Sequence, residues 1–102
     1  MTTSTIQVDD VKEDSPSVLH KLKRIKEQEI YRNDHLVQFN SLTKRELEVM
    51  TLLVIGFNNP KISHHLFISR NTVEQHRKNI NKKLKIKSFS VLIQYALAFD
   101  LV

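Results

Sequence analysis

Cysteine is absent from this 102-residue chain, and glycine occurs only once. Without cysteine the chain has no disulfide, no thiolate nucleophile and no cysteine-ligated zinc site, which fits a reducing compartment. One glycine cannot make a glycine-rich phosphate-binding loop, and no Ser/His/Asp set stands out. We therefore expect neither an enzyme nor a bound cofactor, and the core has to form by packing alone.

Long apolar runs are also missing. The chain has no apolar run of about 18 residues, which a membrane-spanning helix would need. It opens with MTTSTIQVDD instead of a basic segment followed by an apolar one, so we expect no secretion signal. These features favour a soluble, cytoplasmic protein of one small domain, with no membrane contact and no small-molecule substrate.

Acidic residues are scarce in the second part of the chain. Residues 41–102 hold ten Lys/Arg against four Asp/Glu, whereas residues 1–40 hold six against seven. Between positions 61 and 87 eight basic residues accompany a single acid, Glu74. A basic domain behind a neutral arm indicates an anionic partner, although a charge run can also be a solvated helix face.

The chain divides into an arm, a helix and a domain. Residues 1–14 are polar and without period and are expected to form a disordered arm, in which Asp9 and Asp10 are solvated acids. Residues 15–40 are expected to form an N-terminal helix and a connector, and residues 41–102 the main domain.

The N-terminal helix is expected to begin at Ser15-Pro16, a typical cap and first-turn pair, and to end near Arg32, with 34–40 as connector. Its apolar stripe is narrow and consists of Val18, Leu22 and Ile25. Such a helix is marginal by itself, so it needs the body of the domain or a second copy to cover it.

Capping signals mark the helices of the main domain. Thr43 followed by Glu46 forms a capping box for a helix that ends near Ile55, and Gly56 supplies the left-handed residue after it. Asn58 and Pro60 begin a short helix to about Leu66, Ser69 caps a third helix to about Leu84, and Ser88 begins a fourth to about Leu101. No strand-like alternation competes with this all-helical pattern.

The short helix and the longer basic helix, joined by about three residues, have the spacing of a helix-turn-helix. The sequence then resembles the LuxR-type (LuxR/FixJ) helix-turn-helix domain of bacterial transcription regulators. The matching text is LTKRELEVMTLL (42–53), Gly56, Asn59, Ile62, LFISRNTVEQHRKNINKKLKIKS (66–88) and LIQYA (92–96).

The resemblance implies an all-α, four-helix helix-turn-helix domain (LuxR-type output domain) whose third helix enters the DNA major groove and whose last helix commonly forms a homodimer contact. One departure is Pro60-Lys61-Ile62-Ser63, where the family usually has a run like Lys-Glu-Ile-Ala. Lysine replaces the acid there, which predicts a weaker cap and a more positive field. Many such regulators also carry an upstream sensor domain, which forty residues cannot build, so the chain is either a complete regulator or the end of a longer one.

A helical projection of residues 70–84 predicts which side chains reach DNA bases. The N-terminal part of the face opposite Val73 presents Glu74, Gln75 and Lys78, with Asn71 as a weaker fourth. Gln can pair with adenine, Lys with guanine and Glu with the cytosine amino group. For Glu74 the competing role is an ion pair with Lys78, four residues later.

The predicted phosphate contacts lie on the same helix and at the start of the preceding one. They are Asn59, Lys61, Arg70, Thr72, Arg77 and Lys82. These contacts would supply affinity rather than sequence choice.

The positions of the histidines do not indicate a metal site. His76 falls on the buried stripe with Val73, Ile80 and Leu84 and is expected to be a packed, hydrogen-bonded core residue. His64 and His65 are adjacent and point about 100° apart on a helix, a poor arrangement for shared ligation, so we expect no metal.

The last helix has two apolar faces. Val91, Leu92, Tyr95, Ala96 and Phe99 can form its core face. A second stripe consists of Phe89, Ile93, Leu97 and Leu101. Either the N-terminal helix covers this stripe or it is a two-fold dimer contact, which we favour because two DNA half-sites require it.

The leading hypothesis is a sequence-specific regulator that binds double-stranded DNA as a homodimer, with RNA polymerase as a further partner. Two alternatives are a basic helical module that works by protein contact, and a fragment like the promoter-contacting region of a sigma factor.

Overall fold

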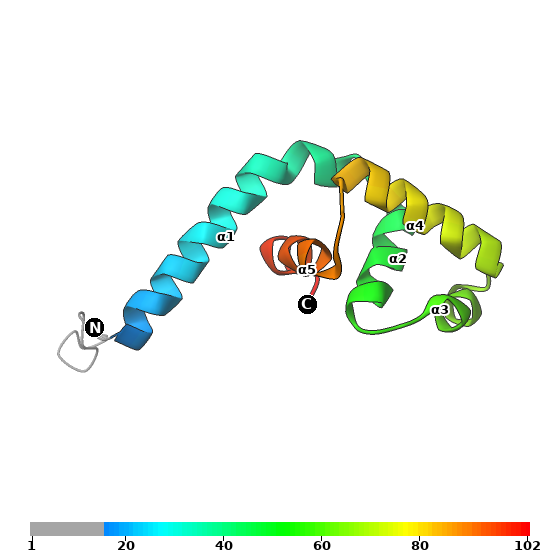
Figure 1. Cartoon of the computed structure of the whole chain (residues 1–102), viewed down its shortest axis with the longest axis horizontal. Coiled ribbons are helices and arrows are strands. Elements are labelled where there is room, and N and C mark those ends of the chain that lie inside the picture. The colour runs from blue at the N-terminus through cyan, green and yellow to red at the C-terminus, as the bar shows by residue number, and fades with distance from the viewer. Residues whose placement is uncertain (1–15) are drawn as a thin grey trace, which may run out of the picture.

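The computed structural model describes residues 16–102, and in them the chain forms five α-helices and no strand. The helices are α1 (Pro16–Asn40), α2 (Lys44–Val54), α3 (Asn59–Leu66), α4 (Arg70–Leu84) and α5 (Phe89–Ala98). Helices α2 to α5 pack together, and α1 extends from them as a long arm (Figure 1). The all-α prediction is confirmed, while the predicted arm of residues 1–14 lies outside the described residues.

The predicted capping box begins α2. Thr43 Oγ1 accepts a hydrogen bond from the Glu46 amide at 3.1 Å, and Glu46 Oε1 accepts one from the Thr43 amide at 2.9 Å. The helix ends before Gly56, whose φ of 103° is the positive value predicted for this position.

Side-chain caps also begin the two following helices. Asn58 Oδ1 accepts from the Lys61 amide at 3.0 Å, and Ser69 Oγ accepts from the Thr72 amide at 3.0 Å. Each cap satisfies an amide that has no partner within its helix. Both helix starts are therefore where the sequence predicts them.

The core lies between α2, α3, α4 and α5. Its buried members are Val49, Met50, Ile62, Val73, Ile80, Leu84, Leu92 and Tyr95. This set includes the aliphatic residues of the stripe predicted for α4. His76, the fourth member of that stripe, is only half-buried, and its Nδ1 atom is buried without a hydrogen-bond partner among residues 16–102. The hydrogen bond expected there is missing.

The expected connector over 34–40 is wrong, because α1 continues as helix to Asn40. The reason is tertiary: Tyr31, His35 and Phe39 recur every four residues and pack against α5. The Tyr31 and Tyr95 rings meet edge to face at 5.5 Å between centroids, and the Phe39 and Phe99 rings stack at 4.0 Å. These contacts sustain helix through a segment whose polar residues favour a break.

The last helix ends at Ala98 and not near Leu101 as expected. Arg32 of α1 donates to the Ala98 carbonyl oxygen at 2.6 Å and pairs with the Asp100 carboxylate at 3.3 Å. Asp100 takes a left-handed φ of 59°, and the Leu101 amide closes the turn on the Ala96 carbonyl oxygen at 2.8 Å. Asp tolerates this conformation better than most residues, so the helix stops here.

Candidate nucleic-acid interface

The turn between α3 and α4 is tight. It begins at Phe67, whose φ is 58°, and the Ile68 amide donates to the Ser63 carbonyl oxygen at 3.1 Å. The Ser63 hydroxyl donates in return to the Ile68 carbonyl oxygen. The small Ser63 side chain thus contacts the turn between the two helices, and the pair forms a helix-turn-helix.

The side chains predicted to read bases are on the outer face of α4. Its inner face is fully covered, with Val73 0% and Ile80 1% exposed. All the predicted readers, Asn71, Glu74, Gln75 and Lys78, are exposed. Helix α4 lies along an edge of the helical bundle and is not enclosed by the other helices (Figure 1). The structure thus leaves these side chains free to contact another molecule.

The Glu74 carboxylate is directed to α3 and not to Lys78. Its Oε1 accepts a weak hydrogen bond from Asn59 Nδ2 at 3.5 Å. Within residues 16–102 the ion pairs are Arg32–Asp100, Arg45–Glu48 and Lys83–Glu46, so a Glu74–Lys78 pair is not formed. The competing role of Glu74 as the ion-pair partner of Lys78 therefore has no support in the structure.

Asn59 also holds Arg77. The Arg77 guanidinium donates to Asn59 Oδ1 at 2.6 Å, and both residues are half-buried. The Asn59 carboxamide therefore lies between the Arg77 guanidinium, which it holds at the N-terminal end of α3, and the Glu74 carboxylate, which it contacts weakly. Two predicted phosphate ligands and one predicted base reader are joined in this way. Their separation in the sequence, 15 and 18 residues, gives no local signal for the contact.

The remaining predicted phosphate ligands, Lys61, Arg70, Thr72 and Lys82, are exposed. Lys61 Nζ lies 4.5 Å above the centre of the Phe57 ring, a cation–π contact that limits its movement. The Thr72 hydroxyl lies 2.9 Å from Ser69 Oγ, next to the cap of α4. Cations and hydroxyls are thus available near the N-terminal ends of both helices, where free amides also favour anions.

Lys83 is a basic residue that does not belong to this surface. Its Nζ lies 2.7 Å from Glu46 Oε1 and donates to the Ser41 carbonyl oxygen at 3.0 Å. Burial acts to raise the pKa of Glu46, but the hydrogen bonds from Lys83 and Thr43 and the Lys83 charge hold that pKa below its usual range. In the sequence Lys83 stands within the basic run of residues 61–87, and no nearby residue marks it for a contact with Glu46.

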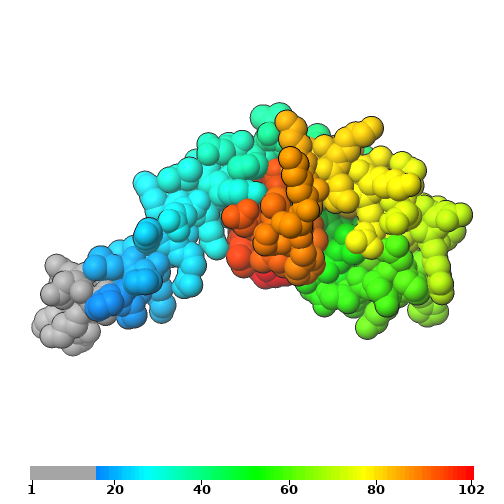
Figure 2. All heavy atoms as spheres, in the orientation of Figure 1, coloured from blue at the N-terminus to red at the C-terminus, as the bar shows by residue number. Residues whose placement is uncertain are grey.

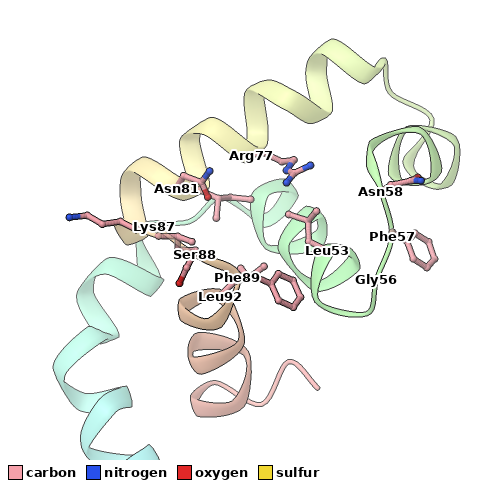
Figure 3. A pocket seen from close by; sticks show the side chains of 12 residues that line it. Leu53, Gly56, Phe57, Asn58, Arg77, Asn81, Lys87, Ser88, Phe89 and Leu92 are labelled. Atoms are coloured by element: carbon pink, nitrogen blue, oxygen red, sulfur yellow. The ribbon is translucent and has the colours of Figure 1, made fainter.

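A groove of about 520 Å³ lies at the surface where α4 meets the C-terminal end of α2 and the start of α5. Figure 3 shows Arg77 and Asn81 of α4 over this groove, with Leu53 from α2 and Phe89 and Leu92 from α5. No carboxylate or imidazole lines it. In the part of the chain that the structure describes, no cluster of three metal-ligating side chains occurs, and no helix is long and apolar enough to cross a bilayer.

Comparison with known proteins matches the same part of the chain. Residues 40–96 fit the family described as bacterial regulatory proteins, luxR family. The oxygen regulatory protein NreC of Staphylococcus carnosus (strain TM300) is 46% identical over 59 residues, and NreC of Staphylococcus aureus (strain JH9) is equally similar. The match covers 58% of this chain but 27% of each relative, so the chain spans about a quarter of their length.

The family match includes the capping box of α2, the helix-turn-helix of α3 and α4, and most of α5. These are the segments on which the resemblance was based, and the resemblance is confirmed. Through them, the chain belongs to the luxR family of bacterial regulatory proteins.

Proposed function

We propose that the chain is a sequence-specific DNA-binding regulator without enzymatic activity, which reads the major groove with α4. The observation that carries this proposal is the division of α4 into a buried apolar face and an exposed face. The exposed face bears Asn71, Glu74, Gln75 and Lys78 near the N-terminal end of the helix. These side chains have the donors and acceptors that distinguish bases in the major groove.

Contacts to the DNA backbone supply the affinity. Arg70, Thr72 and Lys82 on α4, with Lys61 on α3, are exposed and can reach phosphates, and Arg77 is held toward α3 by Asn59. Fixing the Arg77 guanidinium before DNA arrives reduces the entropy lost on binding. Backbone contacts of this kind position the helix, and the base contacts then select the sequence.

Two copies bind together through the outer stripe of α5. Phe89 is 61% and Leu97 45% exposed, and Ile93 between them is half-buried. The fourth predicted member, Leu101, lies beyond the helix and packs against the core. Helix α1 packs against Tyr95 and Phe99 and reaches only the Leu97 end of this stripe, where Leu97 borders a hollow with Gln28 and Tyr31. Phe89 is left uncovered by α1, which favours a two-fold contact over coverage by α1.

The protein acts in the cytoplasm, where bacterial DNA lies, and RNA polymerase is the partner that a regulator bound at a promoter would meet.

Selection of bound fragments from a random DNA pool tests the proposal. We expect an enriched motif with two related half-sites about one helical turn apart. On the winning site, about four phosphate contacts in each half-site predict a log–log dependence of affinity on salt with a slope near −7. An unenriched pool together with a slope near zero would overturn DNA reading and favour a basic module that binds proteins.

A further inference from the structure

The outer face of α1 carries exposed apolar side chains on either side of a centre that holds Leu22, Lys26, Glu29 and Asn33. None of the residues of α1 is buried. The large apolar side chains on this face are Leu19 (50% exposed), Leu22 (59%), Ile25 (63%), Ile30 (50%), Leu36 (43%) and Val37 (82%), with Val18 half-buried among them. We call this set the α1 stripe.

The α1 stripe points away from the rest of the chain. Tyr31, His35 and Phe39 contact α5. At about 100° per residue Tyr31 lies opposite Leu22, His35 about 140° and Phe39 about 100° from it. The first half of α1 also stands clear of the other helices (Figure 2). The described part of the chain therefore offers nothing that covers the stripe.

The α1 stripe is symmetric along the helix about a point between Glu27 and Gln28. Three pairs of its residues at equal distances from this point are identical: Val18 and Val37, Leu19 and Leu36, and Ile25 and Ile30, whereas Leu22 corresponds to Asn33. One position outside Glu27 and Gln28, the corresponding residues are Lys26 and Glu29, which have opposite charges. This pattern is what a helix needs to pair with a reversed copy of itself.

We propose that α1 pairs antiparallel with α1 of a second copy. In this two-fold contact each residue meets the residue that lies equally far on the other side of the midpoint in the second copy. Val18 therefore meets Val37, Leu19 meets Leu36, and each Lys26 lies beside Glu29 of the other copy. Leu22 meets Asn33, and a polar residue at one layer of a helix pair fixes the register at some cost in stability. A parallel pair would instead place Lys26 beside Lys26 and Glu29 beside Glu29.

This contact is separate from the stripe of α5 and needs no DNA. It uses the face of α1 that is turned away from α5, so both contacts are available to one molecule. The occupant is a second copy and not an unrelated protein because the stripe matches its own reversed sequence in residue type and in the charges of Lys26 and Glu29.

The test measures self-association of the full chain without DNA, by analytical ultracentrifugation. We expect a dimer. Lys26→Glu or Glu29→Lys alone should weaken it about tenfold, since each places two pairs of like charges at the contact, and the double variant should restore it. Glu27→Lys, an exposed change of the same kind off the stripe, should leave it unchanged. Circular dichroism of each variant verifies that α1 is retained.

Cysteine mapping tests the direction of pairing and is clean because the chain has no cysteine. Leu19→Cys alone should give no disulfide-linked dimer, whereas the double variant with Leu36→Cys should give one. A linked dimer from Leu19→Cys alone would overturn the antiparallel arrangement. A monomer at all concentrations would overturn pairing through α1. So would a dimer that is lost in Leu97→Lys but kept in the charge variants, because that dimer would form through α5. Neither outcome would affect the DNA proposal.

Discussion

Lys83 Nζ lies 2.7 Å from Glu46 Oε1, and this ion pair joins the last turn of α4 to the first turn of α2. The Glu46 side chain is 4% exposed and that of Lys83 is 31% exposed. Glu46 also completes the capping box with Thr43, so one carboxylate serves a helix start and a contact between helices. The pair holds α4 against the rest of the domain from the side away from the proposed DNA surface.

Removing the Lys83 charge is expected to destabilise the fold. In Lys83→Met the buried Glu46 carboxylate loses its cation, which should lower the free energy of unfolding by about 3 kcal/mol in urea titrations. Lys82→Met is the matched control, because Lys82 is exposed on the neighbouring position. It should change stability by less than about 0.5 kcal/mol and weaken DNA binding instead. Equal stability of the two variants would contradict the structural role of Lys83.

Glu46 should also make stability depend on acid pH. Its pKa in the folded state is lowered, so its contribution is complete above the unfolded value of about 4.3 and is lost as the pH falls through the lower folded value. Urea midpoints measured from neutral to acid pH should therefore decline below about pH 4.3. In Glu46→Gln, which keeps a cap but has no titrating group, the decline should be shallower. An identical decline of the urea midpoint at acid pH in both proteins would show that other carboxylates dominate the pH dependence of stability.

Asn59 and Arg77 should act as a unit in DNA binding. Asn59→Ala frees the Arg77 guanidinium, so it should weaken binding even if Asn59 itself touches no phosphate. A double-mutant cycle with Arg77→Ala, read out as affinity for one DNA site, should give a coupling of about 0.5–3 kcal/mol. The same cycle with Arg70→Ala is the control, since the side-chain hydrogen bonds of Asn59 go to Glu74 and Arg77 and not to Arg70. Additive effects in the first cycle would sink the idea that Asn59 positions Arg77.

Glu74 should determine specificity at one base pair. In Glu74→Ala, discrimination at a single position of the selected motif should fall by about 1–3 kcal/mol, because the carboxylate no longer accepts from a cytosine amino group. Arg70→Ala should instead weaken all sequences alike and reduce the salt slope by about one. An unchanged motif after Glu74→Ala would leave the carboxylate only its contact with Asn59.

Two turns with positive φ should respond in opposite ways. Gly56→Ala should lower the free energy of unfolding by about 1 kcal/mol, because an added Cβ meets no atom within 4 Å but the φ of 103° is strained for it. Phe67 is 90% exposed at a φ of 58°, so Phe67→Gly should raise stability by a few tenths of a kcal/mol up to about 1 kcal/mol. Thermal melts of both variants compare the two effects, and a loss of stability in Phe67→Gly would show that its ring contributes to packing.

Local signals predicted most of the helix boundaries. Thr43, Asn58 and Ser69 cap the helices as their spacing indicates, because a cap depends on residues only three positions apart. The same holds for Gly56 and for the aliphatic stripe of α4. At Asp34 and Leu101, by contrast, local preference was misleading, since contacts between α1 and α5 extend one helix and end the other.

The sequence by itself determined the helical class, the family and the exposed face of α4, since periodicity and capping are properties of neighbouring residues. Only the tertiary structure decided which polar groups meet. In the folded chain Lys83, which stands in the basic run of the sequence, pairs with Glu46. Asn59 likewise lies between Arg77 and Glu74. The tertiary structure also turned the aromatic residues of α1 toward α5 and left the α1 stripe outside. These outcomes depend on how separate helices pack, which no short-range spacing specifies.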